Sequence, residues 1–128
     1  MFSNFEVSVK AYLFLFIVTI IFIYNNNNME KMDFGGAIKA LKEGHAVQRE
    51  GWNGKGMFVV KQVPLHIGLN IIPKMLSLPL AAKDLIMSRE DPHIDYTNQM
   101  LIINPSGRAD SWVPSSSDVF AEDWVILR

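Results

Sequence analysis

Hydrophobic residues after Met32 first follow the spacing of a helix. Apolar positions three or four residues apart share one helical face. Three such residues lie here: Phe34, Ile38 and Leu41. Asp33 can cap the first turn because its carboxylate accepts from free backbone N–H groups, and Gly44 can adopt the left-handed conformation that ends a helix. The pattern predicts a short amphipathic helix over residues 34–43 whose apolar face packs on a sheet.

Two runs with strand character follow this helix. His45–Arg49 alternates between apolar and polar positions, and Met57–Val63 is rich in residues that favour strands. The loop between them contains Asn53-Gly54, a pair that favours a tight hairpin turn because both residues tolerate positive φ. The pattern therefore predicts a hairpin that carries Trp52 near the tip of its loop.

The middle of the chain has a weaker pattern. Pro64–Asp91 contains three prolines, and Lys74–Met87 has only partial helical spacing. Pro79 interrupts any longer helix, and Pro92 closes the segment. We expect a loop with one short helix here.

The sequence pattern of the C-terminal third predicts further antiparallel strands. Asn98–Asn104 and Ala109–Val113 flank the turn residues Pro105–Gly107, which indicates a second hairpin. Trp124–Leu127 has the composition of a final strand. The expected fold class is α+β, with one or two short helices packed on a small antiparallel sheet.

The N-terminus has a different composition. An apolar run, Ala11–Tyr24, precedes four asparagines, and no charged residue lies between Lys10 and Glu30. About 14 apolar residues are few for a membrane span, which needs roughly 20. The alternatives are a membrane anchor, a signal peptide or core element, and translated AT-rich noncoding DNA upstream of a start at Met29 or Met32. We interpret residues 1–31 as an extension and residues 32–128 as the functional domain.

The composition and charge of the chain argue against several classes of function. A chain of 128 residues with 49% hydrophobic content fits one globular domain. The formal net charge of −1 argues against a general nucleic-acid-binding protein. The absence of cysteine excludes disulfides, thiolate zinc sites and a cysteine nucleophile.

Common catalytic and metal-binding motifs are not found. His45, His66 and His93 lack the spacing of metal ligands, so no metal site is predicted. The segment Gly51–Gly56 places its lysine before the last glycine, unlike a phosphate-binding P-loop. No nucleophile elbow or Ser-His-Asp order is present.

Two clusters remain as candidates for ligand binding. Trp52 beside Asn53 and Lys55 can stack on a nucleobase while the amide binds base or ribose edges, although Trp52 could equally pack in the core. In the second cluster, 115–118, serine hydroxyls can donate to phosphates and Asp118 can accept from a ribose hydroxyl or base N–H. The alternative for this cluster is the N-cap of a helix over Val119–Trp124, and both interpretations can hold together.

Three blocks of the sequence resemble the second Thoeris anti-defence family of phages and prophages, once catalogued as a domain of unknown function. The blocks are Met32–Gly44, Arg49–Met57 and Trp112–Trp124. Together with the chain between them they cover residues 32–128 in order. Two features depart from the family pattern: Ser116 stands where glutamine is frequent, and Pro64–Asp91 does not align closely.

The resemblance implies a protein that binds without catalysis and needs no cofactor. Members of this family act as sponges that sequester cyclised ADP-ribose, or in some members cyclic dinucleotides, made by bacterial immune enzymes. They form homo-oligomers, typically tetramers, with ligands at subunit interfaces. The residues implied as ligand contacts are Trp52 and Asn53, followed by Phe34, Gly54, Ser115 and Asp118.

These implications lead to further expectations. We expect a homo-oligomer that binds a cyclic nucleotide in the cytoplasm of a bacterial host, or at its membrane if residues 11–24 form an anchor. Trp52 and Asp118 should lie on opposite sides of one nucleotide site. The alternatives are an enzyme that hydrolyses or modifies a nucleotide, with Asp118 or Glu122 as base, and a structural interaction module.

Overall fold

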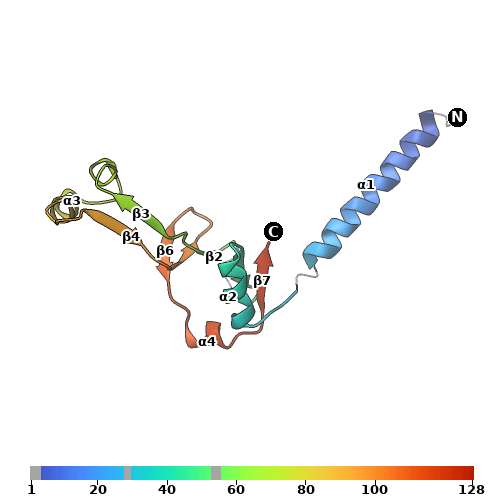
Figure 1. The fold of residues 1–128 in the computed structure, drawn as a ribbon. Helices are drawn as coiled ribbons and strands as arrows, with labels where there is room; N and C mark the ends of the chain where they lie inside the picture. Colours follow the sequence, from blue (N-terminus) through green and yellow to red (C-terminus); the bar gives the residue numbers. More distant parts are fainter. Residues whose placement is uncertain (1–3, 28–29, 53–55) are drawn as a thin grey trace.

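The computed structural model describes residues 4–27, 30–52 and 56–128 and has the expected α+β class (Figure 1). The helices are α1 (Asn4–Asn27), α2 (Phe34–Lys42), α3 (Leu80–Met87) and α4 (Ser116–Val119), with a 3-10 helix η1 (Ile72–Lys74). The strands are β1 (Ala46–Arg49), β2 (Phe58–Lys61), β3 (Leu65–Gly68), β4 (His93–Tyr96), β5 (Met100–Ile103), β6 (Ala109–Trp112) and β7 (Trp124–Leu127).

Five of these strands form one antiparallel sheet in the order β6-β5-β2-β1-β7. Directly opposed residues share a face of such a sheet, and the register forms an apolar row across four strands. This row consists of Ile102, Val59, Val47 and Ile126. The row explains why these short strands pair in this register, because a slip by one residue would turn each strand's apolar side chains to the other face.

Helix α2 packs on this apolar face, and its ends match the sequence prediction. The side chain of Asp33 accepts from the backbone N–H of Gly36 at 2.8 Å. Gly44 follows the helix with φ of 90°, a conformation that side-chain-bearing residues rarely adopt. Both caps are local in sequence, so the predicted helix is confirmed to within one residue.

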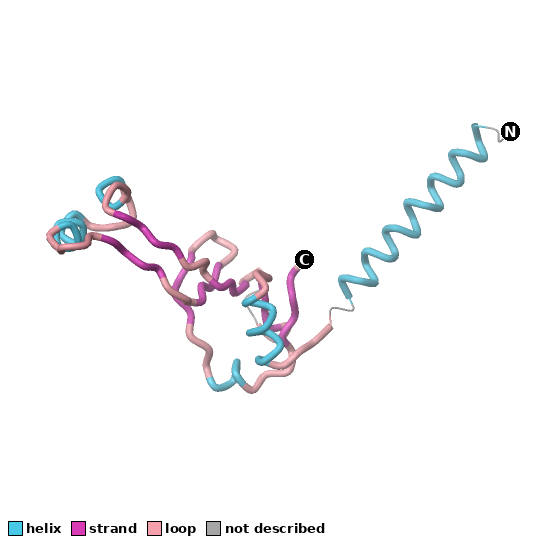
Figure 2. The backbone as a smooth tube through the Cα atoms, in the orientation of Figure 1, coloured by secondary structure: helices cyan, strands magenta, loops and turns pink. Residues whose placement is uncertain are grey.

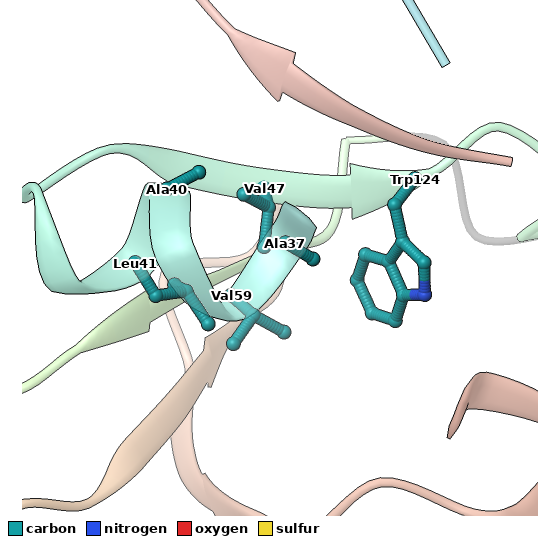
Figure 3. Packing of buried hydrophobic residues seen from close by; sticks show 6 residues of the cluster. All are labelled: Ala37, Ala40, Leu41, Val47, Val59 and Trp124. Carbon is teal, nitrogen blue, oxygen red and sulfur yellow. The ribbon is translucent and has the colours of Figure 1, made fainter. Parts of the chain in front are cut away.

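The hydrophobic core lies between α2 and the sheet (Figure 3). Its buried members are Ala37, Ala40 and Leu41 from α2 and Val47, Val59 and Trp124 from three strands. The small alanines let the helix approach the sheet closely, and Trp124 fills the space beside the first turn of α2. This packing fixes β1 and β7, whose residues Arg49 and Trp124 are directly paired.

Both predicted hairpins are confirmed. Strands β1 and β2 pair, as do β5 and β6, and the predicted final strand is β7. Between β5 and β6, the N–H of Gly107 donates to the carbonyl of Asn104 and closes the predicted turn. The predicted turn at Asn53-Gly54 lies outside the described residues.

The expectation for Pro64–Asp91 is wrong in part. A helix is present there as α3, but residues 65–68 form β3, which pairs with β4 as a separate two-stranded sheet. The pairing joins residues 29 positions apart, such as His66 and Asp95, so no short-range turn signal marks it. Residues 65–96 extend from the main sheet, and we call them the arm (Figure 2).

Helix α1 extends from the remainder of the chain in another direction than the arm (Figure 1). Its side chains are exposed wherever they are described. By length and composition it is long and apolar enough to cross a membrane over Asn4–Ile21.

Candidate functional site

The three tryptophans of the chain meet at one end of α2, and we call them the tryptophan cluster. Trp52 lies edge-on to both Trp124 and Trp112, with ring centroids 5.3 and 6.0 Å apart, and Trp112 and Trp124 are also 6.0 Å apart. Phe34 from the first turn of α2 contacts Trp124, with centroids 5.6 Å apart. Such tilted contacts are favourable because the positive edge of one ring meets the negative face of another.

Trp52 is neither buried in full nor free at a loop tip. It is half-buried and packs against the hydrophobic core, while part of the indole remains at the surface. Its Nε1–H donates to Oδ1 of Asp118 at 3.2 Å. The indole is therefore held by ring contacts on one side and by a hydrogen bond at its Nε1–H.

Asp118 is held in place by the short helix α4, which begins with a capping box. Ser115 is the N-cap, and its hydroxyl accepts from the backbone N–H of Asp118. In return, Oδ2 of Asp118 accepts from the backbone N–H and the hydroxyl of Ser115, at 2.9 and 2.8 Å. The helix-cap alternative for 115–118 is thus confirmed, but the helix it caps is Ser116–Val119 and not the expected Val119–Trp124.

The carboxylate of Asp118 makes four hydrogen bonds within the chain. Its Oδ1 accepts from Trp52 and from Nη1 of Arg49, and its Oδ2 accepts twice from Ser115. A carboxylate has about four lone-pair positions, so all of its acceptor capacity is used. Its backbone carbonyl also accepts from the Nε1–H of the buried Trp124 at 2.9 Å.

Arg49 joins Asp118 to a second carboxylate. Its Nε donates to Oδ1 of Asp123 at 2.9 Å, and Oδ2 of Asp123 accepts from the N–H of Gly51 at 2.8 Å. A Cβ on residue 51 would lie 2.7 Å from that oxygen, so this close approach needs glycine. We call Arg49, Asp118 and Asp123 the carboxylate network.

Hydrogen bonds within the carboxylate network shift the pKa values of its three residues. Burial alone raises the pKa of Asp118, but hydrogen bonds from Ser115, Arg49 and Trp52 outweigh it, and the pKa is lowered. Burial also raises the pKa of Asp123, but the hydrogen bonds from Arg49 and Gly51 outweigh it, and the pKa is lowered. Hydrogen bonds to Asp123 and Asp118 raise the pKa of Arg49. Both carboxylates are therefore ionised at neutral pH.

The structure brings several predicted site residues together. Trp52, Asp118 and Ser115 are connected by hydrogen bonds, and Phe34 touches the tryptophan cluster through Trp124. Trp52 and Asp118 bond directly to each other, and the expected placement of a nucleotide between them stays a prediction. Asn53 and Gly54 lie outside the described residues, so their roles stay predictions.

Sequence reasoning missed Arg49, Asp123, Trp112 and Trp124 as members of this site. Arg49 was assigned only to a strand end, and Trp124 only to the final strand. One signal was available in the sequence. Arg49 lies in the same block as Trp52, and the other three lie in the same block as Asp118. The spatial connection spans 69 and 74 residues of sequence, which local patterns do not encode.

Two hollows lie away from the tryptophan cluster. One of about 250 Å³ is mainly apolar and lies between Ile38 and Leu41 of α2 and Met100 of β5. Another of about 400 Å³ lies beside the arm, near Leu65 and Tyr96. Neither hollow is lined by Trp52 or Asp118.

The arm places two histidines together that are separated in sequence. His66 and His93 stack with centroids 5.3 Å apart, and Nδ1 of His66 lies 2.5 Å from Oδ1 of Asp95. Across the described ranges, no group of three or more histidine or acidic residues is arranged to hold a metal ion. The ring of His93 also lies 3.4 Å from carboxylate oxygens of Asp91 and Asp95.

Comparison with known proteins gives two findings. The sequence profile of the Thoeris anti-defense 2-like domain matches residues 32–127. The chain is also similar to a protein of Bacillus phage SP01 named Thoeris anti-defense 2, with 34% identity over 100 residues. Those residues make up 76% of this chain and 96% of that relative. The profile match contains the whole tryptophan cluster and carboxylate network and leaves α1 outside.

Proposed function

The chain belongs to the Thoeris anti-defense 2-like family, and from this membership we propose that it opposes Thoeris defence by sequestering a cyclic nucleotide signal without breaking it. The ligand class is cyclised ADP-ribose, with cyclic dinucleotides as the second class. Sequestration acts by mass action, so it requires tight binding and high copy number rather than turnover. The family supports the anti-defence role, and the site supports the binding mechanism.

The observation that carries this proposal is the half-buried, oriented indole of Trp52. Trp112, Trp124 and Asp118 support it from behind, so a base can stack on its remaining surface without reordering the side chain. A pre-oriented aromatic ring loses little conformational entropy on binding. Stacking of a base on an aromatic side chain contributes about 1 to 3 kcal/mol.

Asp118 in this proposal positions Trp52 rather than contacting the ligand. All of its acceptor positions are occupied within the chain, and Arg49 holds the carboxylate in place. Arg49, Asp118 and Asp123 together carry one net negative charge. This charge favours base or ribose donors beside the network and directs phosphates away from it.

The same features weigh against an enzyme that uses Asp118 as base. A general base works best with a pKa near the operating pH, whereas the pKa of Asp118 is lowered. Its carboxylate is also bonded to Arg49 on one oxygen and to Ser115 on the other, so it does not face a substrate. Binding without chemistry fits this arrangement better.

We extend the proposal to a homo-oligomer, typically a tetramer in this family, acting in the cytoplasm of the bacterial host. A domain of about 97 residues has limited concave surface, and ligand sites often form between elements or subunits. Exposed apolar side chains on the arm support assembly with further copies: Leu65, Leu69, Ile71, Leu76, Leu80 and Leu85. A single sharp peak at the monomer mass in light scattering at micromolar concentration would contradict this part.

Calorimetric titration of Trp52 variants tests the binding mechanism. Trp52→Ala should weaken binding of cyclic ADP-ribose isomers about ten- to hundredfold, because it removes the stacking surface. The matched control Trp52→Tyr keeps an aromatic ring and should retain most of the affinity. Thermal melting of both variants separates lost binding from lost folding. Unchanged affinity in a folded Trp52→Ala protein would remove the centre of the proposed site.

A second measurement separates sequestration from catalysis. The protein is incubated with the cyclic nucleotide and denatured, and the released ligand is analysed by chromatography. Intact ligand in stoichiometric amount is expected. A linearised or hydrolysed product would establish the enzyme alternative instead, and absence of binding across both ligand classes would favour a structural interaction module.

A further inference from the structure

Helix α1 has apolar side chains on every side. Residues 12–18 are seven successive apolar residues, and all of them are exposed. Successive residues of a helix point about 100° apart, so this stretch covers the whole circumference. A helix that packs on a protein core has one apolar face, and a helix that lies on a membrane surface has one polar face. The pattern of α1 therefore fits surroundings that are apolar on every side of the helix.

The length of α1 is sufficient to cross such an apolar medium. Its 24 residues extend over about 36 Å at 1.5 Å per residue, and the hydrocarbon layer of a bilayer is about 30 Å thick. The apolar run Ala11–Tyr24 covers about 21 Å of this length, and Val7 and Val9 extend it at one end. Lys10 lies near that end, where its long side chain can reach the headgroups.

The polar group in the middle of the helix is satisfied internally. Thr19 donates its hydroxyl proton to the carbonyl of Leu15 at 2.8 Å. Backbone groups in the interior of a helix pair with one another in the same way. Polar groups inside a bilayer must find partners in this way because no water is present.

We propose that α1 crosses a lipid bilayer as a single anchor and holds residues 32–128 at its cytoplasmic face. Positively charged residues near a span favour the cytoplasmic side. Lys31, Lys39 and Lys42 follow α1, whereas Lys10 is the one lysine or arginine in the sequence before Lys31. This orientation places the tryptophan cluster in the compartment where a bacterial immune signal diffuses.

Membrane fractionation of the full chain tests the anchor. Expressed in bacteria with its own upstream DNA, the protein should remain in the membrane pellet after alkaline carbonate washing, and mass spectrometry should detect peptides from α1. The double variant Leu15→Arg and Val18→Arg should shift the protein at least tenfold toward the soluble fraction, because charged side chains at mid-helix are costly in lipid. The control Leu76→Arg and Leu80→Arg adds the same charges to the exposed arm and should stay with the membrane.

Several outcomes would overturn the anchor. Release of the unchanged protein by carbonate would indicate a surface association. A chain that begins at Met29 or Met32 in the cell would show that α1 is not made. Equal distribution of both double variants would mean that α1 does not decide the location. None of these outcomes bears on nucleotide binding, which is measured separately on the tryptophan cluster.

Single cysteines test the orientation, since the natural sequence contains none. In intact spheroplasts, a membrane-impermeant maleimide should label Asn4→Cys at the start of α1. It should label Ser106→Cys, in the exposed turn between β5 and β6, only after lysis. The reverse pattern would place the domain outside, and protection of both sites before lysis would contradict a span.

Discussion

The main sheet and the arm use strands of the same length but differ in how much apolar surface they bury. In the sheet, Val47, Val59 and Trp124 are fully buried against α2. Among arm residues 65–96, only Ile67 and Ile72 are buried, and α3 has no buried residue. The main sheet and α2 thus enclose a buried core, whereas the arm has apolar side chains that remain exposed.

This difference suggests different roles for the two regions: the sheet stabilises the fold, and the arm offers a surface for contact with other copies. Buried apolar area is the main source of folding free energy, so the sheet side of the domain should carry most of it. Contiguous exposed apolar residues are typical of surfaces that meet another molecule. The candidate site lies on the stable side, where the indole of Trp52 keeps its orientation.

The largest expected effect comes from the core. Trp124→Ala should destabilise the domain by about 3 to 5 kcal/mol, because it removes a fully buried indole that supports Trp52 and bonds to Asp118. Leu76→Ala is the control in the arm, where the side chain is 100% exposed, and it should change stability by less than about 0.5 kcal/mol. Chemical denaturation measures both. Similar losses in the two variants would contradict the comparison of the two regions.

The carboxylate network should give the next effect. Arg49→Ala leaves two carboxylates, with side chains 12% and 28% exposed, without their cation, and should cost about 2 kcal/mol. It should also weaken nucleotide binding, because Trp52 loses part of its support. Arg108→Ala is the matched control, since Arg108 pairs with Asp110 at the surface and is 74% exposed. If both arginine variants unfold at the same denaturant concentration, the network does not stabilise the site.

Acid should affect the same network. The pKa values of Asp118 and Asp123 are lowered in the folded state, so these groups bind protons more readily in the unfolded chain. Their stabilising contribution is present above the ordinary aspartate pKa of about 3.9 and is lost as the pH falls below it through the folded-state values. Denaturation curves between pH 7 and pH 2 should show this loss, and Asp118→Asn should show a smaller one. A wild-type slope that Asp118→Asn leaves unchanged would assign the acid sensitivity to other groups.

Substitutions on the arm should have the smallest effect on folding and a clear effect on assembly. The pair Leu80→Glu and Leu85→Glu should change the unfolding free energy by less than about 1 kcal/mol, because both side chains are exposed. The mass measured by light scattering should fall toward that of a monomer, since charges oppose burial of the surface. An unchanged mass would move the subunit contacts away from the arm.

Local sequence signals were sufficient where the partners are close in the chain. Asp33 and Gly36 are three residues apart, and this cap was predicted from sequence. Ser115 and Asp118 are also three residues apart, and their cap was one of two alternatives for 115–118. The turn between β5 and β6 was also predicted correctly. The pairing of β3 with β4 was missed, because its partners are about 30 residues apart and prolines around it suggested a loop.

The sequence by itself determined the α+β class, the helix after Asp33 with its caps, the two hairpins and the family to which the chain belongs. Only the tertiary structure decided that Trp52 bonds to Asp118, that Arg49 links Asp118 to Asp123, and that His66 stacks on His93. Helix and turn signals act over three to five residues because they depend on backbone geometry. The contacts of the site join residues up to 74 positions apart, and they form because α2 and the sheet bury Trp124 and bring the ends of β1 and β7 together.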